Sequence, residues 1–115
     1  MNLPNGDCAY IGDKLERYCL NLNHPKGKNK AALFRLRLGI TLERKAILEA
    51  ALLEAALNAE ATLTRSDQFG RHYHTRFLLK TDVGEAVVLG CWIVRSGEEF
   101  PRLTNVYPLR KAGGD

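Results

Sequence analysis

The feature that most constrains this fold is a change of period at Asn58. Before it, apolar residues recur at the three- and four-residue spacing of helices; after it, apolar and polar residues alternate as in half-buried strands. The pattern predicts helices over 14–21, 28–38 and 42–58, and strands near 60–65, 71–80, 85–95 and 102–109. Because helices come first and strands later, we predict an α+β fold, with N-terminal helices packed on one face of a C-terminal four-stranded antiparallel sheet.

Helix-breaking, capping and turn residues set the expected bounds of these elements. Pro25 and Gly27 both interrupt a helix, and Gly39 suits a helix C-terminus. Asp13 and Thr41 are expected to cap the first and third helices. The connections "SDQFG", "TDVGE" and "RSGEEFP" are short, which favours an antiparallel meander, and "CAYI" near the N-terminus is one further short strand candidate.

The helix over 42–58 is apolar on more than one side. Residues about one helical turn apart are expected to form its main buried stripe: Leu42, Ala46, Ala50, Leu53 and Leu57. Three apolar residues fall outside that stripe: Ile47, Leu48 and Leu52. The helix is therefore expected to pack against the sheet and also against a neighbouring helix or a partner chain, and a homo-oligomer formed through 42–58 is one of these alternatives.

Length and composition are those of one small globular domain. The 115 residues leave room for a single core, so we expect one domain over 1–110 and a disordered tail over 111–115. No apolar run approaches the roughly 20 residues that span a bilayer, and the N-terminus lacks a signal-peptide pattern, so no membrane association is expected. The three cysteines are widely spaced and odd in number; reduced thiols and a cytoplasmic location are expected.

Positive charge is segregated along the chain. Residues 21–42, 68–81 and 100–111 contain no acid and hold five, three and three basic residues, which is eleven of the 17 in the chain. Segregation of this kind concentrates positive potential and favours polyanions if the segments meet in space. If they do not meet, they are three separate solvated faces.

One strand carries two histidines on a face without acids. His72, His74, Arg76, Leu78 and Lys80 point to the same side of the strand over 71–80. Two histidines could divide the acid and base roles in cleaving a phosphodiester. They could also bind one metal ion, but no acid or cysteine occupies a convincing ligand position, so no metal site is predicted. The third alternative is two exposed histidines without a function.

The segment "NHPKGKNKAALF", residues 23–34, concentrates three lysines in one loop. Lys30 lies four residues before Phe34, so it shares a helix face with a core residue and has a fixed direction. We expect it to point toward the same cleft as His74 or Arg76, and Lys26 and Lys28 to point to solvent. The alternative for His24 and Lys30 is structural, as a loop-ordering hydrogen bond and a stem packed on apolar surface.

Two resemblances follow from these motifs. The segment "LERYCLNLNHPKGKNKAALF", together with "FGRHY" and "CWIVRSGEEFPRLTNVYPL", resembles a small bacterial domain family of unknown function. The matching positions of its first motif are Lys14, Leu15, Tyr18, Leu20, Asn21, His24, Pro25, Gly27, Lys30 and Phe34. The order of elements is also similar to that of ribonuclease toxins of the barnase and RelE type. That similarity implies an open sheet face that holds RNA and cleaves it without metal.

We therefore predict a toxin-like, metal-independent ribonuclease. His72 or His74 would act as base or acid, and Lys30, Arg76 and Arg102 would stabilise the charged transition state. Further basic side chains are expected to contact nucleic acid: His24, Lys26, Lys28, Arg35, Arg71 and Lys80. No nucleotide-binding or metallohydrolase motif occurs, so no cofactor is predicted. The expected partners are RNA and an acidic antitoxin or immunity protein. The alternative function is a non-enzymatic module that binds nucleic acid or an acidic protein.

Overall fold

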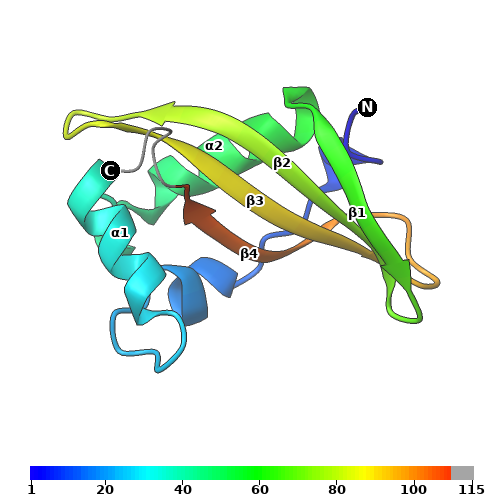
Figure 1. Cartoon of the computed structure of the whole chain (residues 1–115), viewed down its shortest axis with the longest axis horizontal. Helices are drawn as coiled ribbons and strands as arrows, with labels where there is room; N and C mark the ends of the chain where they lie inside the picture. The colour runs from blue at the N-terminus through cyan, green and yellow to red at the C-terminus, as the bar shows by residue number, and fades with distance from the viewer. Residues whose placement is uncertain (110–115) are drawn as a thin grey trace.

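The computed structural model describes residues 1–109 and shows helices followed by a four-stranded antiparallel sheet (Figure 1). The α+β prediction is confirmed. The regular elements are α1 (Lys28–Leu38), α2 (Lys45–Asn58), β1 (Ala61–Asp67), β2 (Gly70–Lys80), β3 (Glu85–Arg95) and β4 (Arg102–Pro108). Three single turns complete them: η1 (Gly6–Cys8), η2 (Leu15–Cys19) and η3 (Leu42–Arg44). The tail predicted over 111–115 lies outside the described residues.

The sheet is a meander in the order β1-β2-β3-β4, joined by the predicted turns. Its centre is the hairpin of β2 and β3, which stays in register from Gly70 opposite Arg95 to Lys80 opposite Glu85. Both outer strands carry an irregularity: β1 between Leu63 and Arg65, and β4 opposite Cys91 and Trp92. A bulge of this kind re-aims the side chains that follow it.

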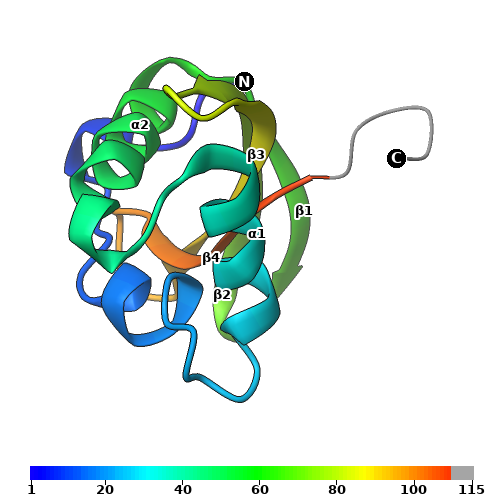
Figure 2. The ribbon, with the colours of Figure 1, turned by 90° about the vertical axis from the view of Figure 1, so that its left-hand side faces the viewer.

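Helix α2 crosses one face of the sheet, and α1 lies beside the β4 edge (Figures 1 and 2). Gly90 of β3 lies beneath α2, because a Cβ there would come within 3.3 Å of the Leu52 side chain and 2.9 Å of Thr75 Oγ1. The indole of Trp92 donates a hydrogen bond of 3.0 Å to that hydroxyl. This buried polar pair is therefore satisfied, as an interior requires.

The predicted buried stripe of α2 is wrong. The buried residues are Leu48, Leu52, Ala55 and Ala56, whereas Leu53 and Leu57 are 39% and 48% exposed. Leu42 belongs to η3, before the α-helix starts, and is 43% exposed. Since both stripes are apolar, the helical period identified the helix but could not select the face that packs on the sheet.

Local details of the N-terminal half also differ from expectation. In place of a helix over 14–21 there is one π turn, in which the Leu20 amide donates to the Leu15 carbonyl. Asp13 does not cap this turn through its side chain but pairs with Arg17 at 3.0 Å. Thr41 likewise makes no side-chain cap. Of the strand candidate "CAYI", only Tyr10 forms a bridge, to Arg102, whereas Gly39 ends α1 in the left-handed conformation as predicted.

The thiols of all three cysteines are free, with Cys19 buried, Cys91 half-buried and Cys8 exposed. No helix within residues 1–109 combines the length and the apolar character that crossing a bilayer requires.

Candidate functional site

The face of the sheet turned away from α2, here called the outer face, brings together polar side chains from three strands. Register places His74, Cys91 and Asn105 in one row across β2, β3 and β4. The next row contains Arg76, Leu89 and Tyr107. Because cross-strand partners project to the same side, His74 and Arg76 face the polar residues of β4 across a narrow strip of β3.

Helix α1 contributes a lysine to the rim of this face. The Nζ atom of Lys30 lies 4.7 Å from the ring centroid of Tyr107 and 5.7 Å from that of Tyr18. Lys14 Nζ lies on the same Tyr18 ring, 5.8 Å from its centroid. These are cation–π distances, so the two tyrosine rings hold the lysine head groups in place. Lys30 therefore lies at the β4 side of this face, next to the row that contains Tyr107, and Lys26 and Lys28 are exposed.

The environment favours the neutral form of His74. Partial burial lowers the pKa of His74, and the charge of Arg76 lowers it further. A neutral imidazole can accept a proton, which a general base must do.

The environment of Tyr107 favours the protonated form of its phenol. Burial raises the pKa of this phenol, and Cys91 adds to the effect while Arg76 opposes it. A protonated phenol can donate a hydrogen bond or a proton. The outer face thus combines a proton acceptor, a proton donor and the cations Arg76 and Lys30, of which Lys30 is held by the tyrosine rings.

A hollow of about 510 Å³ opens on this face next to His74 and Arg76. Glu60, Thr62 and Thr64 form its other wall, at the β1 edge of the sheet. Its volume falls in the range of about 300–1,000 Å³ that is usual for small-molecule sites.

His72 lies in a different environment from His74. Its Nε2 atom is 3.0 Å from a carboxylate oxygen of Asp67, and its side chain is only 18% exposed. The same carboxylate accepts the amides of Phe69 and Gly70, at 2.9 and 3.2 Å, and so orders the β1–β2 turn. The geometry therefore ties His72 to the hairpin end and leaves His74 as the histidine of the site.

Arg102 is likewise engaged. Its guanidinium donates two hydrogen bonds of 2.9 Å to Glu98 and lies 4.8 and 5.2 Å from the ring centroids of Phe100 and Tyr10. A bidentate carboxylate neutralises most of its field. It therefore braces the β3–β4 connection, and we do not include it in the site.

The side chains expected to contact nucleic acid do not converge. His24 Nδ1 accepts the amides of Lys26 and Gly27, both at 3.0 Å, and its ring meets Tyr18 edge-on at 4.8 Å, which is the structural alternative considered for it. Arg71 is exposed near the hairpin end, and Lys80 pairs with Glu85 at 3.7 Å. No group of three or more His, Cys, Asp or Glu within residues 1–109 is placed to hold a metal ion.

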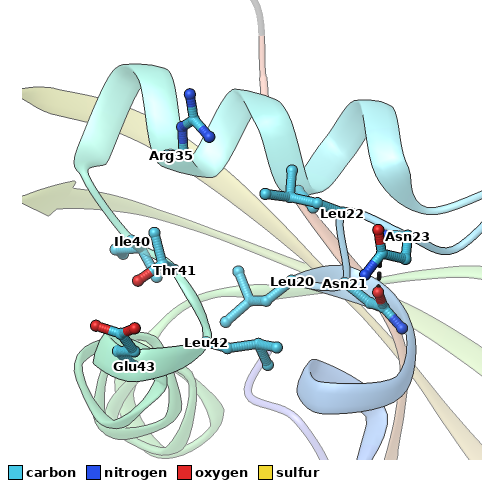
Figure 3. Close-up of a pocket in the computed structure, with 10 residues that line it drawn as sticks. Leu20, Asn21, Leu22, Asn23, Arg35, Ile40, Thr41, Leu42 and Glu43 are labelled. Atoms are coloured by element: carbon cyan, nitrogen blue, oxygen red, sulfur yellow. Dashed lines mark hydrogen bonds between the residues drawn. The ribbon is translucent and has the colours of Figure 1, made fainter.

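Arg35 lies at a separate hollow of about 200 Å³ between α1, the 20–23 segment and η3 (Figure 3). Leu20, Leu22 and Leu42 project into it, and Arg35 and Glu43 stand at its rim (Figure 3). Apolar and polar side chains share this lining, and the histidines are not part of it.

The sequence leaves open whether Tyr107 stacks on a base or packs at an edge of the sheet, and it gives no signal for Glu60 or Thr62. The alternation of β4 is visible in the sequence, but the register that places Tyr107 in the same row as Arg76 and Leu89 is not. Register depends on the bulge in β4, and no residue type marks that bulge in the sequence.

Comparison with known proteins identifies the fold. The family model described as "Domain of unknown function (DUF6883)" matches residues 2–110. A chain of a contact-dependent growth inhibition toxin–immunity protein complex from Klebsiella pneumoniae 342 is similar in structure, with a TM-score of 0.71 and 16% sequence identity. The match covers 92% of this chain and 97% of that chain. No curated protein matches.

Proposed function

Because the chain belongs to this family, for which no function is known, we propose an activity from the geometry: a toxin-like ribonuclease that cleaves RNA on the outer face without a metal. The observation that carries the proposal is the gathering of His74, Arg76, Tyr107 and Lys30 on the outer face, where His74 and Arg76 also line the hollow. The fold shared with a chain of a toxin–immunity protein complex supports a toxin-related role. Fold alone does not carry a chemistry, so the argument rests on the side chains.

The proposed reaction is an internal transesterification. The neutral ring of His74 takes the proton of the ribose 2′-hydroxyl, whose oxygen then attacks the adjacent phosphorus. Arg76 and Lys30 neutralise the charge that builds on the phosphoryl oxygens. Tyr107 donates its proton to the departing 5′-oxygen. The products are a 2′,3′-cyclic phosphate and a free 5′-hydroxyl, and the base and the acid end with exchanged protonation states.

The test is cleavage of an end-labelled single-stranded RNA in the presence of a chelator. Wild type should produce 2′,3′-cyclic phosphate ends, detected by mass spectrometry. His74→Gln removes the base and should lower the rate about 10²- to 10⁴-fold, the usual contribution of a general base. His72→Gln is the matched control on the same strand and should retain activity. Intact RNA with wild type, or equal rates for the two variants, would overturn the assignment.

The alternative is a non-enzymatic module for nucleic acid or an acidic protein. The favouring observation is that Lys30 and Arg76 have no carboxylate partner among the ion pairs of the described residues, so an acidic surface could meet both. Under this alternative, RNA binds in a salt-dependent manner but is not cleaved. For the toxin proposal, an acidic immunity protein would cover the same face, and its binding should be weakened by Arg76→Ala and should inhibit cleavage.

A further inference from the structure

We propose that α1 is a membrane-surface helix, which places the domain on bilayers containing anionic phospholipids through Leu33 and Leu36. This role goes beyond the proposed ribonuclease activity and does not depend on it. The sequence predicts no membrane association because it lacks an apolar run long enough to span a bilayer. A helix that lies on the bilayer surface needs no such run, only one apolar side and cations beside it.

Helix α1 is apolar on two opposite sides, and the fold uses one of them. The buried side consists of Ala31, Phe34 and Leu38. On the other side Leu33 is 39% exposed and Leu36 is 77% exposed, the highest value for a large apolar side chain in the described residues. Because they are three positions apart, the two leucines project together from the helix. They form an apolar stripe that nothing in the chain covers.

Cations border this stripe on both sides. At 3.6 residues per turn, Lys28 and Arg35 fall on one side of the two leucines and Arg37 on the other. Lys28 and Arg35 are exposed and have no carboxylate partner among the ion pairs of the described residues. Residues 21–42 contain no acid that would repel a phosphate head group. Leucines between rows of Lys and Arg are the pattern of a helix that lies among anionic head groups.

The position of α1 allows a flat surface to reach the stripe. The helix lies at one end of the molecule, and in the view from that end it stands in front of the sheet (Figures 1 and 2). Val83, 54% exposed, packs at Gly39 and adds a further apolar side chain next to the end of α1. The acid beside it, Asp82, is already paired with Arg44 at 2.8 Å. The charge that this end presents to a bilayer is therefore positive.

The exposed leucines of α2 show that apolar exposure alone does not select a bilayer. Leu53 and Leu57 are 39% and 48% exposed. Glu49 lies one turn before Leu53, and Glu54 is the next residue along the helix. These carboxylates would repel anionic head groups, whereas the residues beside the α1 leucines attract them. Of the two exposed leucine pairs, only the one on α1 combines apolar and positive character.

A lipid surface suits the shape of the stripe. Neither α1 leucine lines any of five hollows found in the described residues. The two side chains protrude from a convex helix, and fluid acyl chains can surround them without a matching pocket. An acidic protein would have to supply such a pocket itself, since hot-spot side chains in protein interfaces fill well-packed pockets.

The experiment is sedimentation of the full chain with vesicles, with no RNA present. Vesicles of phosphatidylcholine with about one-third phosphatidylglycerol should bind the wild type at low salt, and binding should fall as salt screens the charges. Vesicles of phosphatidylcholine alone should bind it at least about tenfold more weakly. The double variant Leu33→Gln, Leu36→Gln should lose about tenfold or more in affinity for the anionic vesicles. Arg35→Gln should lose about fivefold, the usual effect of one basic residue at such a surface.

The matched controls make the same substitutions elsewhere. Leu53→Gln, Leu57→Gln removes two leucines of similar exposure from α2, and Arg71→Gln removes one positive charge from the hairpin end of β2. Both should bind the anionic vesicles as the wild type does, and circular dichroism should show that every variant is folded. Equal losses in the two leucine variants, or equal binding to neutral and anionic vesicles, would overturn the proposal. Absence of binding to anionic vesicles at low salt would also overturn it and would leave the stripe to an acidic protein.

Discussion

The two faces of the sheet are made by alternate residues of the same strands and differ in almost every property. Toward α2 lie Tyr73, Val88 and Trp92, all nearly inaccessible, with the Trp92–Thr75 hydrogen bond as a satisfied polar contact. Toward the outer face lie His74 and Arg76, with Lys30 added from α1. The face under α2 provides stability. On the outer face Leu89 and Ile93 of β3 are also buried, whereas its β1–β2 part is left free to hold charges that a core could not accept.

The largest effect that separates the two faces is on stability. Trp92→Ala should lower the free energy of unfolding by about 3–5 kcal/mol, because it leaves a large cavity and removes the partner of Thr75. His74→Gln, one position along the pleat of β2 from buried Thr75, should change it by less than about 1 kcal/mol. Urea unfolding of both variants measures the difference, and equal losses would mean that the outer face is also part of the core.

The second effect is on activity and concerns Lys30. Lys30→Met keeps the apolar stem on Tyr107 and removes the charge, so RNA cleavage should fall about 10²- to 10³-fold while the fold is retained. Lys26→Met removes the same charge from the exposed part of the loop and should be silent. Equal rates for the two variants would show that Lys30 has only a structural role.

Features that depend on local spacing can be predicted from the sequence, whereas features that depend on how distant segments meet cannot. The order of the elements and the strand pairing follow from spacing and turn residues, which act locally. The pairing of Arg102 with Glu98 and of His72 with Asp67 depends on how the hairpins close, and no local pattern contains that information. Arg102 and His72 do not belong to the candidate site, because Glu98 and Asp67, two acids next to turns, pair with them.

The third effect is the pH dependence of the outer face. His74 has a folded-state pKa below its ordinary 6.5, because of burial and then Arg76, so the unfolded chain binds its proton more readily. The stability that this difference contributes is complete above about pH 6.5 and is lost as the pH falls below it. Cleavage should lose activity over the same acid range as the base becomes protonated.

The measurement is a pair of pH profiles, of urea stability and of cleavage rate. Arg76→Met should move the acid limb of the cleavage profile toward higher pH, since one of the two causes of the shift is gone. The groups that face His74 are Arg76, Glu60 and Cys91. Of these, only Arg76 lowers the pKa of His74, through its positive charge. If the acid limb of the cleavage profile stays in place in Arg76→Met, the lowered pKa of His74 is due to burial alone.

The fourth effect is the difference in reactivity among the three thiols, Cys8, Cys19 and Cys91. Burial raises the pKa of Cys19 to about 11, and burial also raises that of half-buried Cys91. Since the thiolate is the reactive form, a thiol reagent at neutral pH should label exposed Cys8 first, Cys91 slowly and Cys19 only on unfolding. Mass spectrometry after timed labelling gives the order. Early labelling of Cys19 would mean that η2 opens readily from the sheet.

The smallest expected effect concerns the exposed apolar stripe of α2. Leu53 and Leu57 are 39% and 48% exposed, and both project away from the buried Leu48 and Leu52 that pack on the sheet. If α2 contacts only other parts of its own chain, the double variant Leu53→Gln, Leu57→Gln should change the free energy of unfolding by no more than about 0.5 kcal/mol per site. It should also leave the sedimentation coefficient unchanged.

If the chain instead forms a homo-oligomer through this helix, the wild type sediments as the larger species and the double variant as a monomer. In that case α2 is covered on both sides, and the outer face of the sheet carries the exposed site proposed above.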